Sequence, residues 1–325
     1  MNRRRLAALV LALVALGLAL GLPALQTKSS RAASGDVTGA APAAATSAYE
    51  YMAELSDEIG PRVAGTPAER RAAERITQWF ARLGYDPSVQ EFSFTAGGAS
   101  RASANVVATK IGSSPRQIVI GAHYDSVSAG RGAFDNASGV ALMMQLADAL
   151  RAEKTPYTLV FVAFGAEEAG LKGSKAYFES MTAEQKSATM LMIDFDSVAT
   201  GDQVYCYSSA AQAWPQLTLR SLARQMGATI LTSPGLNKDY PYGTTGDWSD
   251  HAVFAKNGIP YLYLEATNWL LGDKDGYINS AKYGEIWHSK KDTISYIEQQ
   301  LPGRMEGQLE VEFAALAEFL TTYSR

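Results

Sequence analysis

The sequence predicts an α/β fold in three α/β/α layers, with helices on both faces of a central, mostly parallel mixed sheet. Short runs rich in β-branched and apolar residues alternate along the chain with longer stretches of helical periodicity. Strands that alternate with helices connect as parallel neighbours, because each helix crosses back over the sheet. Hydrophobic residues make up 47% of the 325, which is enough for a large buried core.

The first segment predicts export. Three arginines at positions 3–5 precede an apolar run over residues 6–25, which is the order of charged and hydrophobic regions in a secretory signal. A run of this length also suffices for one spanning helix. Residues 1–25 are therefore either a signal peptide or an N-terminal membrane anchor. In both cases the rest of the chain is expected outside the cytoplasm, either secreted or periplasmic or tethered through residues 6–25.

A linker and one folded domain are expected after this segment. Residues 26–47 are rich in Ala, Ser, Thr, Gly and Pro without an apolar period, which predicts a flexible linker. Residues 48–325 contain no internal repeat and are expected to form one domain. The single cysteine, Cys206, excludes an internal disulfide and is interpreted as a core residue. A net charge of −4 with mixed signs excludes a basic face for nucleic acid.

The first predicted helix of the domain begins at Thr66 and ends near Leu83. Thr66-Pro67-Ala68-Glu69 has the pattern of a capping box with proline at the first helical position. Apolar and β-branched runs predict strands at 105–109, 117–121, 158–164, 190–195 and 203–207. Helical spacing of apolar residues predicts helices at 139–151, 171–179 and 214–226, and a last helix around 309–320.

Residues that can bind a metal follow the predicted strands. The chain has only three histidines, and His123 closes the second strand together with Asp125. Open α/β sheets bind ligands at the carboxyl ends of their strands. If the strand continued to Asp125, both side chains would lie on one face. A pair of this kind suits a metal-bound imidazole that a neighbouring carboxylate orients.

Acidic residues recur at comparable places along the chain. Asp135 lies just before a predicted helix, and Glu167 and Glu168 follow the third strand. Asp194 and Asp196 lie at the end of the fourth strand. Neighbouring acids after such apolar runs are costly unless a positive charge offsets their repulsion. A metal site supplies that charge.

The complete donor set predicts a catalytic pair of zinc ions. The last histidine, His288, lies in a polar segment before the C-terminal helix. Two histidines and three carboxylates without a thiolate suit catalytic rather than structural zinc. Two Zn²⁺ ions balance the charges of Asp135, Glu168 and Asp196 and leave room for a hydroxide. Glu167 is then free to act as the base.

At these residues the chain closely resembles the co-catalytic zinc peptidases of family M28, which include secreted bacterial aminopeptidases. The matching segments lie in the same order over residues 50–295: residues 58–67, 121–126, 135–139, 167–170, Asp196, 249–251, 288–289 and Asp292. The resemblance implies the fold of a zinc-dependent exopeptidase. It also implies an aminopeptidase, whose substrates are peptides with a free N-terminus.

The resemblance assigns a ligand set for two Zn²⁺ ions per chain. Asp135 would bridge the ions, of which one is held by His123 and Asp196. Glu168 and His288 would hold the other.

Two aspartates at the end of the fourth strand are candidates for one ligand position, Asp194 and Asp196. Residues 193–196 have the order apolar, polar, apolar, ligand that the family shows, so the resemblance favours Asp196. His251 and Asp250 are expected to support the pocket through hydrogen bonds rather than to bind the metal.

The resemblance also implies a mechanism. Asp125 would lie behind His123, and Glu167 would take a proton from water and return it to the leaving amine. One departure concerns the oxyanion: Trp287 stands where several relatives carry a tyrosine. The oxyanion donor therefore stays open, and the candidates are Tyr240, Tyr242 and Tyr261.

Two other functions fit part of the pattern. A glutaminyl cyclase would share the fold, bind a single zinc and carry a pair like Trp287-His288. Residues 165–174, however, run into a helix without the insertion that cyclases carry there. An inactive, membrane-tethered binding homologue would usually have lost ligands, and this chain keeps all five and the base. The peptidase is therefore the favoured interpretation.

Overall fold

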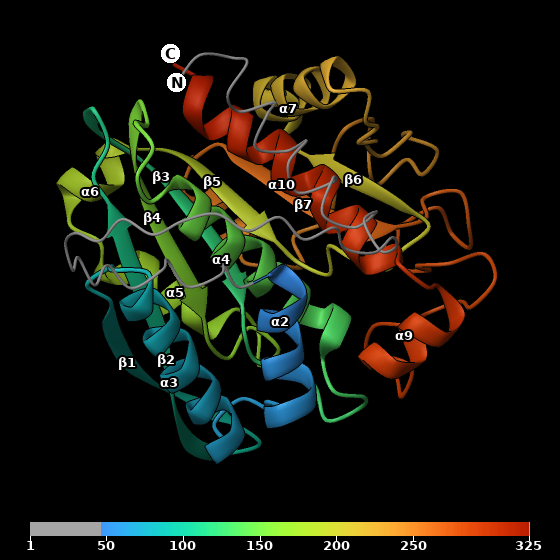
Figure 1. Ribbon diagram of the computed structural model, residues 1–325, viewed down its shortest axis with the longest axis horizontal. Coiled ribbons are helices and arrows are strands. Elements are labelled where there is room, and N and C mark those ends of the chain that lie inside the picture. Colours follow the sequence, from blue (N-terminus) through green and yellow to red (C-terminus); the bar gives the residue numbers. More distant parts are fainter. Residues whose placement is uncertain (1–46, 325) are drawn as a thin grey trace, which may run out of the picture. The chain divides into compact units, whose positions relative to one another are not determined.

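A mixed sheet of seven strands organises the part of the chain that this computed structural model describes, residues 47–324 (Figure 1). Four strands at its centre, in the order β4-β3-β5-β7, run parallel, and the outer strands β2, β1 and β6 pair antiparallel. The strands in chain order are β1 (Ser88–Ala96), β2 (Ala99–Lys110), β3 (Ser114–His123), β4 (Tyr157–Phe164), β5 (Thr189–Phe195), β6 (Gln203–Tyr207) and β7 (Tyr261–Thr267).

Helices lie on both faces of this sheet, which confirms the predicted three layers (Figure 1). Helices α2, α4 and α10 pack over one face, and α5 and α8 pack on the other. The helices of the described residues are α2 (Ala48–Ala53), η1 (Glu54–Ile59), α3 (Pro67–Arg82), η2 (Ala133–Ala137), α4 (Ser138–Leu150), α5 (Lys172–Ser180), α6 (Ala183–Ala188), η3 (Ala210–Gln212), α7 (Trp214–Gln225), α8 (His251–Lys256), α9 (Ile294–Gln300) and α10 (Arg304–Thr322).

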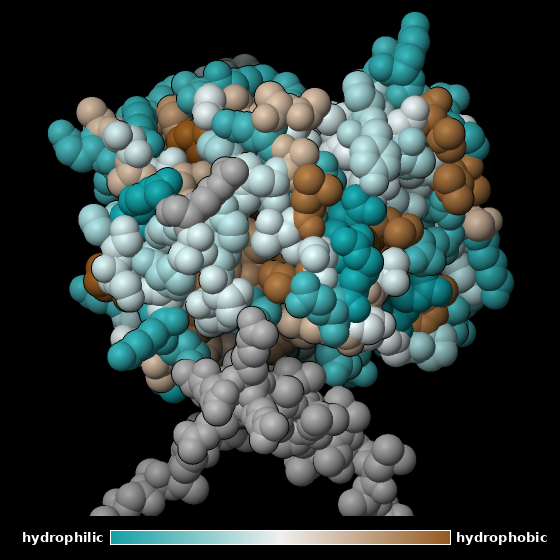
Figure 2. Space-filling view, turned by 90° about the horizontal axis from the view of Figure 1, so that it is seen from above, coloured by the Kyte–Doolittle hydropathy of each residue, from teal (hydrophilic) through white to brown (hydrophobic). Residues whose placement is uncertain are grey.

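Each central strand contributes to two hydrophobic cores. In β3, Ile118 and Ile120 belong to the core beneath α4, whereas Val119 packs with Phe254 of α8 on the opposite face. Successive strand residues point to opposite faces, and both faces are covered, so β4 is buried along its whole length. Cys206 is fully buried in the core beneath α4, as predicted. On the face drawn in Figure 2, hydrophilic residues predominate and hydrophobic ones form small separate groups.

The strands and helices that the sequence did not predict are either short or largely exposed. β1 is largely exposed at an edge of the sheet, and it pairs with β2 across a turn at Gly97 and Gly98. Both glycines have a positive φ, which suits a tight turn. β7 is a short, wholly buried run, which periodicity alone does not separate from a helix. The sequence predicted neither strand, and it also missed α2, α6, α8 and α9.

The predicted capping box at the start of α3 is only half formed. Thr66 Oγ1 accepts the N–H of Glu69 as expected. The Glu69 carboxylate, however, turns inward and accepts the backbone N–H groups of Gly65 and Ala166 and the hydroxyl of Ser103. The prediction of a reciprocal box is wrong because these buried donors, brought close by the fold, need an acceptor.

The predicted leader at 1–25 and all but the last residue of the linker at 26–47 lie outside the described residues. Within residues 47–324, no helix has the length and apolar character needed to span a bilayer.

Candidate metal centre

Histidines and acids gather at the carboxyl ends of the parallel strands. His123 is the last residue of β3, Glu167 and Glu168 follow β4, and Asp196 follows β5. Together they line a cavity of about 350 Å³, whose wall also contains Asp135 and His288. The structure therefore brings the five predicted ligands and the predicted base to one cavity.

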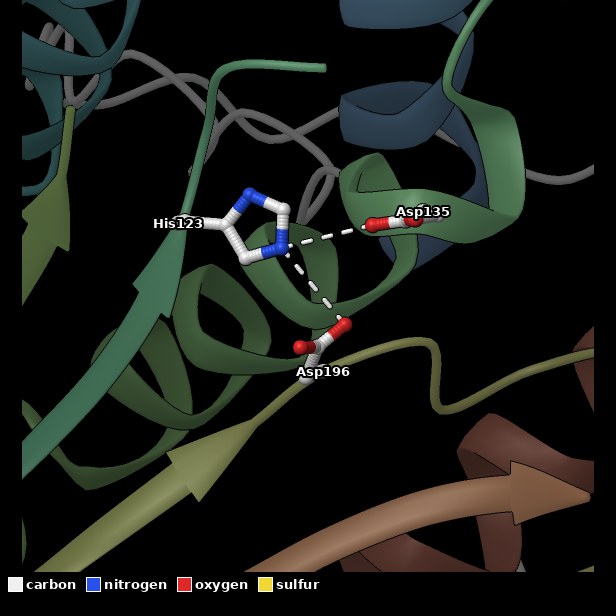
Figure 3. Close-up of side chains that lie close together, drawn as sticks. All are labelled: His123, Asp135 and Asp196. Atoms are coloured by element: carbon white, nitrogen blue, oxygen red, sulfur yellow. Dashed lines mark ion pairs between the residues drawn. The ribbon is translucent and has the colours of Figure 1, made fainter. Parts of the chain in front are cut away.

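The Asp135 carboxylate lies between two histidines. Its Oδ1 is 3.3 Å from His123 Nε2, and its Oδ2 is 3.1 Å from His288 Nε2. His123 Nε2 is also 3.5 Å from Asp196 Oδ1, and Figure 3 shows both carboxylates facing this nitrogen. On the other side, His288 Nε2 is 3.0 Å from the Glu168 carboxylate. Two groups of three possible ligands therefore share Asp135.

These spacings fit a pair of zinc ions. Nitrogen and oxygen ligands lie about 2.0–2.2 Å from zinc, so two ligands of one tetrahedral ion are about 3.4 Å apart. The nitrogen-to-oxygen distances from His123 and His288 to Asp135 are close to this value. Imidazole and carboxylate groups without thiolate are also the donors of catalytic zinc. The residues present therefore fit two Zn²⁺ ions.

The electrostatics of the protein side chains favour bound positive charge. Burial lowers the pKa of His288, but the Asp135 and Glu168 carboxylates outweigh it and raise this pKa to about 10. Burial also lowers the pKa of His123, but the Asp196 and Glu167 charges outweigh it and hold this pKa well above its usual range. Burial and the Asp135 charge raise the pKa of Glu168 to about 7. A cluster of this kind retains protons unless cations replace them.

Asp125 supports the turn that carries the two adjacent glutamates. Its Oδ1 accepts the N–H of Glu167 at 2.9 Å, and its Oδ2 accepts that of Glu168 at 3.1 Å. His123 Nδ1 lies 3.5 Å from Asp125 Oδ1 and 3.2 Å from the Asp125 backbone oxygen. β3 ends at His123, so His123 and Asp125 do not share a strand face. The loop after β3 brings them together instead.

Asp292 holds the backbone around Asp135. Its Oδ1 accepts the N–H of Phe134 at 2.6 Å, and its Oδ2 accepts that of Asp135 at 3.2 Å. Asp292 is buried, and this burial raises the pKa of its carboxyl to about 7. The family resemblance includes Asp292, but the sequence did not predict its role.

Asn136 joins the Asp135 segment to the end of β5. Its amide donates to the Phe195 backbone oxygen at 2.7 Å, and its Oδ1 accepts the N–H groups of Gly139 and Ser197. A Cβ at Gly139 would lie 2.5 Å from the Phe195 oxygen, so α4 begins close to β5 only because this residue is glycine. Asp135 and Asp196 are thereby fixed close together.

Glu69 holds the residue just before the two adjacent glutamates. Ala166 has a φ of 54°, a left-handed conformation that costs a non-glycine residue about 1–2 kcal/mol. Its N–H donates to Glu69 Oε1 at 3.0 Å. Ser197 and His288, which flank or form the site, also have positive φ values of 54° and 51°. Strained backbone of this kind clusters at functional sites.

The two aspartates at the end of β5 face different surroundings. Asp196 lines the cavity, whereas Asp194 Oδ2 accepts the backbone N–H of His251 at 2.7 Å and lies 3.1 Å from His251 Nδ1. His251 is buried and does not line the cavity. Asp250 is also buried, and burial together with nearby Asp194 raises its pKa well above its usual range.

The predicted tyrosine candidates for the oxyanion do not line the cavity. Tyr261 packs against the His251 ring, and Tyr242 is exposed. The tyrosines that line the cavity are Tyr263 and Tyr277. The Trp287 indole N–H donates to the Tyr277 backbone oxygen at 3.1 Å, so this bond already occupies it.

Comparisons of the sequence link the chain to one group of hydrolases. The family model described as Peptidase family M28 matches residues 105–310. The chain is 36% identical to the alkaline phosphatase isozyme conversion protein of Escherichia coli over 279 residues, which is 75% of this chain and 81% of that protein. It is 28% identical to aminopeptidase YwaD of Bacillus subtilis over 57% of this chain, although it spans only 38% of that protein.

Solved structures share the fold at lower identity. A zinc aminopeptidase from Bacillus subtilis superimposes with a TM-score of 0.68 at 18% identity, over 85% of this chain and 95% of that one. A glutaminyl cyclase from Porphyromonas gingivalis superimposes with a TM-score of 0.66 at 21% identity, over 84% of this chain and 96% of that one. The fold is therefore common to both kinds of enzyme.

Proposed function

The chain belongs to peptidase family M28, and on this basis we propose that it is a zinc aminopeptidase with two Zn²⁺ ions, acting on peptides with a free N-terminus. The observation that carries the proposal is the Asp135 carboxylate, which turns one oxygen toward each histidine. A carboxylate shared by two ligand groups is the arrangement that a two-metal hydrolase needs. The name of the Bacillus subtilis relative supports the aminopeptidase activity.

The ligand roles follow from the two groups around Asp135. His123 and Asp196 would hold one ion, and Glu168 and His288 would hold the other. When bound, the ions lower the pKa of a water molecule and polarise the carbonyl of the scissile peptide bond.

Glu167 is placed to move the proton. Its Oε2 lies 4.0 Å from His123 Nε2, at the edge of the first ligand group, and its backbone is held by Asp125. Burial raises the pKa of Glu167 above its usual range, although the His123 charge opposes this. A carboxyl with a raised pKa can take a proton from water and return it to the leaving amine.

The cavity suits the end of a peptide. At about 350 Å³ it lies near the lower limit for small-molecule sites, which leaves room for a terminal residue rather than an extended chain. The acids of its wall can also accept the α-ammonium group of a free N-terminus.

Export of the enzyme is part of the proposal. The three arginines and the apolar run at 6–25 have the order of a secretory signal, and the same run could tether the enzyme to a membrane. One relative, which is 37% identical over 64% of this chain, is named a probable lipoprotein aminopeptidase. The net charge of −4 argues against nucleic acid as a partner.

Metal analysis combined with hydrolysis tests the proposal. We expect two zinc ions per chain and hydrolysis of aminoacyl-anilides, which a chelator abolishes and added Zn²⁺ restores. A peptide with an N-terminal glutamine serves as the second substrate, because a glutaminyl cyclase would bind one zinc and cyclise it without hydrolysis. A purified protein without zinc and without either activity would instead indicate a binding homologue.

A further inference from the structure

Glu265 lies in the wall of the same cavity but has no task in the proposed reaction. It belongs to β7, and the parallel register pairs Phe195 of β5 with Leu264 of β7. Glu265 comes directly after Leu264, and Asp196 comes directly after Phe195. Glu265 therefore lies on the strand next to the proposed metal ligand Asp196. The residue is only 8% exposed. A buried carboxyl group in a substrate cavity needs a partner or a purpose.

Two hydroxyl groups fix the Glu265 carboxylate. Tyr207 donates to Oε1 at 2.6 Å, and Tyr263 donates to Oε2 at 3.1 Å. Tyr207 in turn accepts a hydrogen bond from the indole N–H of Trp269. Burial raises the pKa of Glu265 to about 7, although these two donors oppose the rise by favouring the ionised carboxylate. Each oxygen accepts more than one hydrogen bond, so lone pairs stay free for a further donor. The carboxylate is thus held rigidly in the cavity wall.

The wall of the cavity is strongly acidic. In the described residues it contains six acids and neither lysine nor arginine; the acids are Asp135, Glu167, Glu168, Asp196, Asp247 and Glu265. Three of them are proposed metal ligands, and Glu167 is the proposed base. Asp247 is exposed and already pairs with Lys256 at 3.5 Å. Glu265 is thus the acid of this wall that has neither a role in the proposed reaction nor a cationic partner in the described residues.

The rest of the cavity wall suits a side chain with an apolar stem. Trp248, Tyr277 and Trp287 line the cavity, and Tyr277 is 45% exposed, so it lies nearer the mouth than Glu265. Aromatic faces attract cations and cover methylene groups. A lysine or arginine side chain combines such a stem with a charged end.

We propose, resting on the proposed function, that Glu265 binds the cationic side chain of the substrate's N-terminal residue and makes the enzyme selective for lysine and arginine. The α-ammonium group is not its partner, because this nitrogen lies only about 2.5 Å from the scissile carbonyl carbon and stays beside the metals. Neighbouring strands are about 4.8 Å apart, so the Glu265 position suits a group farther along the side chain.

The experiment compares lysyl- and methionyl-anilides, whose side chains are similar in length but differ in charge. We expect the wild-type enzyme to show the higher kcat/KM on the lysyl substrate. In Glu265→Gln, the ratio of lysyl to methionyl kcat/KM should fall by about 10- to 100-fold, the effect of losing a charged hydrogen bond. The matched control is Asp247→Asn, which removes one exposed acid from the same cavity and should change the ratio far less.

Each other outcome overturns the inference in a distinguishable way. A wild-type preference for the methionyl substrate would exclude a cation-binding site while leaving the proposed peptidase intact. Equal losses on both substrates in Glu265→Gln would assign Glu265 to folding or to the α-ammonium group. Hydrolysis of neither substrate by the wild-type enzyme would overturn the proposed function and this inference with it. The wild-type ratio tests the selectivity for a cationic residue even if the variant does not fold.

Discussion

Asp125 fixes Glu167 by its backbone, because the Asp125 Oδ1 accepts the Glu167 N–H at 2.9 Å. The Glu167 side chain is therefore free of structural hydrogen bonds to Asp125 and can face the cavity. The same carboxylate holds the next N–H, that of Glu168, through its other oxygen. One buried acid thus orients both the proposed base and a proposed ligand.

Glu167→Gln should leave zinc binding intact and lower kcat by about 100-fold or more, because an amide cannot accept the proton of the attacking water. Zinc content and anilide hydrolysis are measured on the same preparation. Glu179→Gln is the control, since Glu179 is an exposed acid on α5. Turnover near that of the wild type would remove Glu167 from the mechanism.

The number of zinc ions bound per chain should differ between variants of Asp135 and His288. Asp135 faces both ligand groups, so Asp135→Ala should bind less than one zinc per chain. His288 faces only one group, so His288→Ala should keep about one zinc per chain. Elemental analysis after dialysis checks both values. Equal zinc contents in the two variants would contradict a bridging role for Asp135.

Asp292→Asn should disturb the Asp135 segment. In an amide, an NH2 group replaces one of the two oxygens that now accept the N–H groups of Phe134 and Asp135, so one of these N–H groups would face a donor. We expect a loss of about 1–3 kcal/mol in the free energy of unfolding and weaker zinc binding. Urea denaturation and zinc titration measure these effects, with Asp273→Asn at an exposed loop position as control. A variant that matches this control would show that Asp292 does not position Asp135.

Glu69 should make stability depend on pH. Burial raises the pKa of Glu69 to about 7, so the folded state binds this proton more tightly than the unfolded state. The free energy of unfolding should therefore fall as the pH rises from about 4.5 to 7, and Glu69 contributes up to about 3 kcal/mol of this fall. Glu69→Gln removes that contribution.

Urea denaturation of metal-free protein between pH 4.5 and 8 measures this difference. Glu74→Gln, an exposed acid on the same helix, should follow the wild-type pH dependence. If Glu69→Gln showed the same pH dependence of stability as the wild type, the Glu69 carboxyl would not have the raised pKa given above.

The central part of the fold could be predicted because its strands are strongly apolar. The runs at 158–164 and 190–195 coincide closely with β4 and β5. β1 could not be predicted in this way, because it is an exposed edge strand whose pairing with β2 supplies its order. α8 is one short segment whose helix is stabilised by packing against β5 and β7 rather than by its own sequence.

The cavity residues could be predicted from scarce residue types at strand ends and from the order of the family motifs. Their supports could not. Glu69 has the sequence signature of a helix cap, yet its carboxylate binds Ala166, which is 97 residues away. Glu265 lies in a strand that periodicity missed, and only the register of β7 against β5 places it beside Asp196. Contacts of this kind depend on the completed fold.

The position of Asp135 between His123 and His288 also links the proposed centre to the order of synthesis. His123 ends β3, whereas His288 lies close to the last two helices, α9 and α10. A polypeptide that stops before residue 288 would therefore retain the ligand group of His123, Asp135 and Asp196 but lack the histidine of the other group. The complete proposed centre can assemble only after nearly the whole domain has been made.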